Sequence, residues 1–282
     1  AAPTDPPATP FRLAQEGYQY EFPRDHGSHD AFRTEWWYYT GHLETAEGRR
    51  FGFELTFFRR AIAPDQVETR PSRWSVDQLY LAHLAITDVT GQRFYFQDRI
   101  SRAGLGKAGA DPTHLHVWLD QWGAESSGGT GDQQKLEAKA DGVALSLTLD
   151  PAKPLVVHGE RGLSKKGAAV GQASHYYSFT NLTTAGNLTI GTETYRVTGT
   201  SWMDHEFGSA DMGADLAGWD WFSIQLADKR ELMVYRLRHA DGSSDAASSG
   251  TLVLADGRTQ HLSATDIQLT PLDTWTSPTS KA

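Results

Sequence analysis

The chain has 282 residues, 39% of them hydrophobic, and a formal net charge of −9, which indicates a globular protein of one large or two modest domains. Its acidity and the lack of a basic stripe argue against a nucleic-acid partner, and no apolar run approaches the roughly 20 residues of a transmembrane segment. The absence of cysteine excludes disulfides, zinc–thiolate sites and cysteine nucleophiles.

The first ten residues, AAPTDPPATP, are rich in Ala and Pro and have neither a basic start nor an apolar signal core. Such a segment is typical of a mature protein after cleavage of an export signal. We therefore expect a periplasmic or extracellular protein in which residues 1–20 form a leader or linker. The alternative is an artificial chain boundary.

Short runs of β-branched and aromatic residues then follow one another, whereas amphipathic helical periodicity is scarce. Strands are predicted at 35–43, 50–58, 79–87, 92–98, 114–120, 134–139, 143–149, 174–181, 187–190, 194–199, 219–227, 231–238, 250–254 and 265–270. Turns are predicted at Glu47-Gly48, Asp141-Gly142, Asp241-Gly242 and Asp256-Gly257. Residues 123–132 and 239–250 are predicted to be loops. The pattern predicts an antiparallel all-β protein of the sandwich or barrel type.

A domain boundary is predicted near residue 198. The strands before it suffice for a barrel of the eight-strand size that holds one small ligand. Four or five strands follow it, too few to close a second barrel, and an open sheet leaves unpaired edges. We therefore predict a barrel over residues 21–198 and a second, incomplete β-domain over 199–282, or one whose edges are covered by the first domain or another chain.

Residues 199–222 are the least ordinary stretch of the sequence. Here Asp204, His205, Glu206 and Asp220 lie among Trp and Phe residues, and EWWYYTG at 35–41 repeats the mixture with Glu35. Burial among aromatics disfavours the charged carboxylate, so such an acid should have a raised pKa and serve as a general acid near neutral pH. The alternative is a structural carboxylate paired with an arginine, with Arg236 and Arg238 as candidates.

Strand alternation divides these residues between faces. Glu35 lies on the same face of its strand as Trp37. Asp204 lies on the face of its strand that is opposite to His205. For any single Trp, core packing is the better explanation. The density of Trp and Tyr beside His and acids nevertheless predicts an aromatic-lined cavity for an apolar or ring-bearing ligand. The residues expected to contact the ligand are Trp36, Trp37, Tyr38, His83, His175, Tyr177, Trp202, Trp219 and Trp221.

Signals for metals and cofactors are weak. His114 and His116 have an i, i+2 spacing that can chelate a metal, but no third ligand stands at a recognisable spacing. The loop PRDHGSHD could bind a metal through Asp25, His26 and His29, or be an ordinary polar turn. The chain has no P-loop, no G-x-G-x-x-G and no G-x-S-x-G. We predict neither a metal nor a cofactor.

Six motifs occur in a characteristic order: EWWYYTG, LAHLAITD (81–88), HYYSFTNL (175–182), VTGTSWMDHEFG (197–208), GWDWFSIQLADKRELMVYRLR (218–238) and the Gly-Thr-Leu-Val run at 250–253. The set resembles the AttH-like family of predicted secreted hydrolases, related to carotenoid 1,2-hydratases (hydroxyneurosporene synthases) and a fungal flavonoid hydratase. The resemblance implies two consecutive lipocalin-like domains. It also implies, for the hydratases, addition of water to an isolated double bond through an acid, with aromatic faces stabilising a carbocation.

The hydratase relatives are thought to use a His followed two residues later by Trp, and a Tyr followed two residues later by Asp. The matching positions here are His205 with Phe207 and Tyr235 with Leu237, so the carotenoid-type proton donor is not matched. The acids that could replace it are Asp204, Glu206, Asp220 and Glu35. The family's second domain also continues past a W-x-S-P segment like the one at 275–278, close to which this chain ends.

We therefore predict an exported enzyme that acts on a hydrophobic small molecule by hydration, isomerisation or hydrolysis. Glu35, Asp204, His205 and Tyr235 are its predicted catalytic residues. A second hypothesis is a lipocalin-like carrier of an apolar ligand without catalysis. A third is a scaffold in which Glu35 and Asp204 are buried, paired with arginine and not reached by any cavity.

Overall fold

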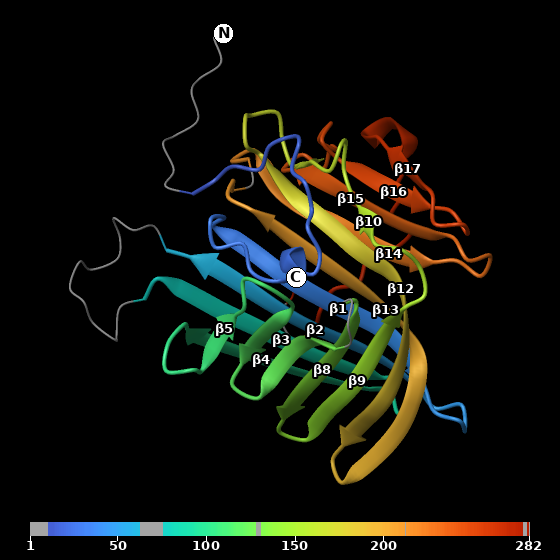
Figure 1. The fold of residues 1–282 in the computed structure, drawn as a ribbon. Coiled ribbons are helices and arrows are strands. Elements are labelled where there is room, and N and C mark those ends of the chain that lie inside the picture. The colour runs from blue at the N-terminus through green and yellow to red at the C-terminus, as the bar shows by residue number, and fades with distance from the viewer. Residues whose placement is uncertain (1–10, 63–75, 128–130, 212, 279–280, 282) are drawn as a thin grey trace.

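Strands account for almost all regular structure in the computed structural model, which describes residues 11–62, 76–127, 131–211, 213–278 and 281. Within these residues, 13 strands form one antiparallel sheet and four form a second (Figure 1). Two 3-10 turns, η1 (Arg24–His26) and η3 (Ala264–Asp266), accompany them. No helix in the described part of the chain is long and apolar enough to cross a bilayer.

The first sheet contains two meanders joined by a long hairpin. Its strands are β1 (Thr34–Glu44), β2 (Arg50–Ala61), β3 (Gln78–Asp88), β4 (Arg93–Arg102), β5 (Ala108–Ala110), β6 (His116–Leu119), β7 (Trp122–Ser127), β8 (Gln133–Ala140), β9 (Val143–Pro151), β10 (Val156–Val157), β11 (Ser164–Lys165), β12 (Ala173–Ile190) and β13 (Glu193–Gly208). The order is β4-β3-β2-β1-β13-β12-β9-β8-β7-β6-β5, with β10 and β11 on β12. Because β3 and β4 approach β6, the sheet nearly closes into a barrel.

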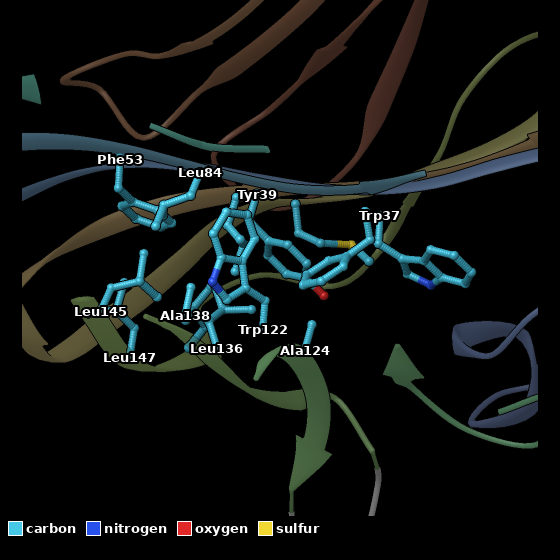
Figure 2. Packing of buried hydrophobic residues seen from close by; sticks show 14 of the residues in the cluster. Trp37, Tyr39, Phe53, Leu84, Trp122, Ala124, Leu136, Ala138, Leu145 and Leu147 are labelled. Atoms are coloured by element: carbon cyan, nitrogen blue, oxygen red, sulfur yellow. The ribbon is translucent and has the colours of Figure 1, made fainter. Parts of the chain in front are cut away.

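The barrel interior is filled by the inward residues of each strand. Trp37 and Tyr39 on β1 alternate with more exposed neighbours, and both pack in one cluster with Trp122, Leu84 and Leu147 from other strands (Figure 2). Trp37 lies at one end of this cluster. Such alternation is the expected pattern for a closed antiparallel sheet. By the same alternation Glu35 faces inward on β1, next to Trp37 at the edge of the apolar core.

The second sheet covers the outer face of the first. It consists of β14 (Leu216–Gln225), β15 (Glu231–His239), β16 (Ser249–Val253) and β17 (Thr259–Leu262), in that order. Met233, Tyr235 and Leu237 on β15 pack against Tyr176 on β12 and Trp202 on β13. Residues 201–208 of β13 are therefore buried on both faces, which explains why large aromatics crowd this stretch.

The predicted all-β antiparallel class is confirmed, as are the four Gly turns, whose Gly residues all have φ between 77° and 86°. Several predicted strand and loop bounds are wrong. Residues 174–190 belong to one strand, 194–208 to another, and 123–127 to β7. Residues 265–270 include the 3-10 turn η3 instead of a strand, and β17 was not predicted. The domain bounds stay a prediction: position 198 falls within the continuous strand β13, and residues 1–10 of the expected leader or linker (1–20) lie outside the described part of the chain.

Candidate functional site

The segment that comprises η1 and the residues up to β1 (24–33), with Asp25, His26 and His29, is fixed against the barrel by backbone contacts. Trp37 donates its Nε1–H to the carbonyl oxygen of His26 at 3.0 Å, and the Ser28 amide donates to the Asp111 carbonyl at 2.8 Å. A Cβ on Gly27 would lie 2.4 Å from that same Asp111 oxygen, so only glycine permits this approach. The segment thereby holds its acid and two histidines against the inner face of the sheet.

Glu35 is the centre of a buried polar cluster. Its Oε1 lies 2.7 Å from His29 Nδ1 and 2.8 Å from His205 Nε2. Its Oε2 accepts hydrogen bonds from Arg59 Nε and from the His29 amide, both at 2.9 Å. None of these four residues is more than 2% exposed. Cross-strand register explains the arrangement, because Glu35 of β1 pairs directly with Arg59 of β2.

The charge environment keeps Glu35 ionised. Burial alone would raise its pKa, but the charge of His29, hydrogen bonds from His205 and His29, and the charge of Arg59 together hold the pKa well below its ordinary value. The sequence-based expectation of a raised pKa is therefore wrong for Glu35. This carboxylate is an acceptor and counter-ion, and it does not donate a proton near neutral pH.

His29 lies between two carboxylates. Its Nδ1 faces Glu35, and its Nε2 is 3.1 Å from Oδ1 of Asp25. Burial lowers the pKa of His29, but the charge of Glu35 and the hydrogen bonds to Asp25 and Glu35 outweigh this and raise it. With an acceptor at each nitrogen, the ring is held as an imidazolium. Phe207 stacks on it with ring centroids 3.6 Å apart.

Asp25 remains ionised despite its burial. Burial would raise its pKa, but hydrogen bonds from His29, the Glu21 amide and Arg24 lower it. The Tyr18 hydroxyl also donates to Asp25 Oδ1 at 3.0 Å. The site thus contains one imidazolium between two carboxylates.

His205 is neutral. Burial lowers its pKa to about 4, although the hydrogen bond and the charge of Glu35 act in the opposite direction. Its Nδ1 lies 2.9 Å from the Tyr177 hydroxyl, and its ring stacks on Trp37 at 4.8 Å between centroids. Asp25, Glu35, His29 and His205 thus offer a cation, two anions and a neutral imidazole within one hydrogen-bonded group.

A cavity of about 340 Å³ reaches this group at Asp25 and His29, a volume at the lower end for small-molecule sites. Its described lining residues are Arg12, Gly17, Tyr18, Gln19, Glu21, Arg24, Asp25, His29, Ala31 and Phe32. Tyr18 and Phe32 supply the aromatic wall, and the remainder is mostly polar. None of the Trp residues that the structure describes lines this cavity, so the predicted wall of Trp residues does not describe it.

Asp204 lies on the other face of β13. It accepts hydrogen bonds from Trp202 Nε1 at 2.7 Å, from the Tyr176 hydroxyl at 2.9 Å and from the Ser178 hydroxyl. Burial raises its pKa to about 7, which agrees with the expectation for this acid. Because alternation turns Asp204 away from His205, the two lie in separate groups of residues.

Tyr235 lies with the Asp204 side of the sheet. Its hydroxyl donates to the Lys165 carbonyl at 2.8 Å and is 3.2 Å from the Ser164 hydroxyl. It borders a second cavity of about 210 Å³, while Leu237 is buried. The predicted catalytic set of Glu35, Asp204, His205 and Tyr235 therefore does not converge on one cavity.

The predicted arginine partners bind a different acid. Arg236 and Arg238 both pair with Asp220, at 2.8 and 3.1 Å. Glu35 pairs with Arg59 instead, and Asp204 has no arginine partner in the described ranges. The ion pair of Glu35 with Arg59 thus agrees with the scaffold hypothesis. The cavity nevertheless reaches His29, which is in direct contact with Glu35.

The predicted ligand-contacting residues are dispersed. Trp37 and Tyr177 reach the Glu35 group, and His175 stacks on the cavity residue Tyr18 at 4.4 Å. Those near Asp204 or on its side of the sheet are Tyr38, Trp202 and Trp221. Half-buried Trp36 alternates with the inward residues of β1, His83 packs against Phe58 and Phe96, and Trp219 is 60% exposed.

Sequence reasoning missed three residues of the group as acid–base candidates. Asp25 and His29 were considered only as metal ligands, and Arg59 not at all. The available signal was the pair of histidines three residues apart in the loop that precedes Glu35.

Metal ligation is geometrically conceivable at two places in the described chain. His29, Glu35 and His205 bring three ligand atoms within 4.8 Å of one another, and so do Asp215, His239 and Asp245. In the first group both ring nitrogens already lie at hydrogen-bond distance from one Glu35 oxygen, and Arg59 occupies the other. A four-coordinate site needs a further ligand, and that group holds only three. His114 and His116 stack on each other without joining any such group.

The comparisons agree with this architecture. The chain is similar to the crystal structure of an AttH protein from Nitrosomonas europaea, with a TM-score of 0.87 and 34% identity over 96% of this chain and 81% of that one. Kievitone hydratase from Nectria haematococca has a TM-score of 0.64 and 13% identity, over 91% and 74% of the two chains. CghA has a TM-score of 0.50 and 16% identity, over 87% and 64%.

The two less similar structures show a shared lipocalin-like fold and nothing further, given their low identity. No curated protein matches the chain. The AttH-like family matches residues 13–282, which is nearly the entire sequence. The motif resemblance is thereby confirmed, and the chain belongs to the AttH-like family.

Proposed function

We propose that this protein is an exported enzyme that transfers protons to and from a small molecule bound in the cavity beside Asp25 and His29. The observation that carries the proposal is the His29 imidazolium, which is held between the Asp25 and Glu35 carboxylates. Of these three residues, Asp25 and His29 line the cavity. A cation poised between two anions can donate a proton at its Nε2 and be restored afterwards. Export remains an expectation from the sequence.

The division of roles follows from the charges. His29 is the acid, because a carboxylate at each ring nitrogen stabilises its protonated form and raises its pKa. Asp25 is ionised, because its pKa is lowered in part by the hydrogen bond and the charge of His29. Once His29 has released its proton, that charge is gone, and Asp25 becomes the stronger base that accepts a proton from water or from the ligand. Glu35 orients the ring and stabilises its charge, as a buried carboxylate does for a catalytic histidine.

An imidazolium is a weaker acid than the protonation of an isolated alkene requires. The chemistry that fits this site is therefore hydration or isomerisation of a polarised double bond, or hydrolysis that protonates a leaving oxygen. The wall favours an amphipathic ligand, with its apolar part against Tyr18 and Phe32 and its polar part toward Arg12 and Arg24. The proposed ligand is therefore amphipathic, which is a narrower class than the hydrophobic small molecule predicted from the sequence.

Isotope labelling tests the proposal and separates the reaction classes. The protein is incubated with kievitone, α,β-unsaturated phenolic ketones and phenolic esters in D2O and in H2¹⁸O, and the products are analysed by mass spectrometry. Hydration adds both deuterium and ¹⁸O, isomerisation adds deuterium alone, and hydrolysis divides the molecule and adds ¹⁸O. Binding without label in any compound of the panel would contradict the enzymatic proposal.

A carrier of the same kind of ligand is the second candidate. The observation that favours it is the pair of arginines, Arg12 and Arg24, on the cavity wall, which suits an anionic or phenolic ligand that is held and released unchanged. A ligand that copurifies with the protein and is returned without isotope exchange would support this alternative.

A further inference from the structure

A second line of polar groups leads from Glu35 away from the cavity. His205 Nε2 lies 2.8 Å from Glu35, and His205 Nδ1 lies 2.9 Å from the Tyr177 hydroxyl. The same hydroxyl is 2.8 Å from His26 Nδ1, and His26 Nε2 is 3.3 Å from Oδ1 of Asp132. Glu35, His205, Tyr177 and His26 are fully buried, whereas the Asp132 side chain is 43% exposed.

The outer end of this chain is positioned by a close backbone approach. Gly131 has φ +79°, and a Cβ there would come within 2.8 Å of Pro23 Cβ. A side chain at residue 131 would therefore be strained and would push Asp132 away from His26. The link between the exposed carboxylate and the buried imidazole depends on this glycine.

This series of hydrogen-bonded side chains, from Glu35 to Asp132, has one hydrogen fewer than it has contacts. Its four contacts, from Glu35 through His205, Tyr177 and His26 to Asp132, need four hydrogens. Two neutral imidazoles and one phenol supply three. If His205 donates to Glu35, Tyr177 to His205 and His26 to Tyr177, no hydrogen is left for the contact between His26 Nε2 and Asp132. That contact is also the longest of the four, at 3.3 Å.

We propose that this chain is a proton path from solvent at Asp132 to the Glu35 group, and that it takes up one proton when His29 releases its own. The inference rests on the proposed function for its use in turnover. Its existence as a path rests on the contacts alone. The charged groups that face it are Asp132, Glu35, Asp25, His29 and Arg59.

The uptake can be followed bond by bond. A proton from water, guided by Asp132, binds His26 Nε2. His26 passes its Nδ1 proton to the Tyr177 oxygen, and Tyr177 passes its own proton to His205 Nδ1. All four contacts then hold a hydrogen, and His205 becomes an imidazolium beside Glu35.

This charge replaces the one that His29 has lost, so the Glu35 carboxylate is never left without a cation on its Oε1 side. The Tyr177 hydroxyl can also donate to the Asp25 carbonyl at 3.1 Å. That donation interrupts the path, because His205 then receives no hydrogen from Tyr177.

Proton exchange at the histidine rings tests the path on the ligand-free protein. In a sample labelled with ¹⁵N histidine, NMR measures exchange of the His205 ring proton with solvent. His158 is the internal control, because it is equally buried but its nitrogens contact only the hydroxyls of Thr251 and Ser178. We expect exchange at His205 to be faster than at His158 by on the order of ten-fold, since a dead-end ring exchanges only through local opening.

Three variants complete the test. Tyr177→Phe and Asp132→Asn should each slow exchange at His205 toward the His158 rate. Tyr39→Phe should leave it unchanged, because the buried Tyr39 hydroxyl makes no hydrogen bond within the described structure. If Tyr177→Phe does not fold, the exposed Asp132→Asn decides. Equal exchange at His205 and His158, or no effect of Asp132→Asn, would overturn the path. A path that persists in a protein with no isotope incorporation would overturn only the proposed function.

Discussion

The buried carboxyl of Asp204 should make the free energy of unfolding depend on pH. Burial raises its pKa from 3.8 to about 7, so as pH rises the unfolded chain loses this proton before the folded protein does. The stabilising contribution is complete below the unfolded pKa and is lost as pH rises through the folded one. A difference of about 3 pKa units corresponds to about 4 kcal/mol, at 1.36 kcal/mol per unit.

Asp204→Asn removes this titration and keeps a side-chain oxygen that can accept from Trp202 and Tyr176. Urea unfolding of both proteins at several pH values isolates the contribution of this one group, because other titrations cancel in the difference. We expect the variant to gain up to about 4 kcal/mol relative to wild type between acidic and mildly alkaline pH. Parallel stability curves for the two proteins would refute the argument that Asp204 is buried with a raised pKa.

Further predictions concern the Glu35 group and the barrel core. Glu35→Gln leaves Arg59 without its buried counter-charge and the His29 cation with Asp25 alone, which should cost about 3–5 kcal/mol and lower the melting temperature by on the order of 10 °C in calorimetry; an unchanged midpoint would show that the group is not charged. His29 has a raised pKa, so its contribution to stability is present below the unfolded pKa and lost as pH rises through the folded value. A His29→Gln variant should lack this loss in alkaline unfolding titrations. Trp37→Ala should cost about 3–5 kcal/mol, whereas Trp219→Ala, at an exposed position, should change stability by about 0.5 kcal/mol or less; similar costs would contradict the described burial.

The fold was largely predictable because alternation and turn chemistry are local. The turn at Asp141-Gly142 and the strands on either side of it required only neighbouring residues. The length of β12 and β13 did not follow from local signals, since residues 199–208 extend as strand by pairing with β1 and β12, which is a tertiary effect. Residues 265–270 have strand-like composition but no partner strand in the described structure.

The site was predictable only in part, for a physical reason. Alternation correctly placed Asp204 and His205 on opposite faces of one strand, yet the prediction grouped them in one active site. Burial predicted a raised pKa for both acids, which is correct for Asp204 and wrong for Glu35. The difference lies in three partners that lower the Glu35 pKa. Arg59 and His205 reach Glu35 from neighbouring strands through the sheet register, and His29 reaches it from the loop before β1, whose conformation no local pattern describes.

The role of His29 as proton donor is tested by comparing proton transfer by wild type and two histidine variants. With the compound that becomes labelled in D2O, deuterium incorporation is measured for His29→Gln and for His158→Gln, which alters an equally buried histidine on the other side of the sheet. We expect His29→Gln to lose incorporation by about 10²-fold or more, as for removal of a general acid, while folded His158→Gln retains it. Full incorporation by His29→Gln, with the cavity still binding the compound, would contradict the assignment of His29 as the proton donor.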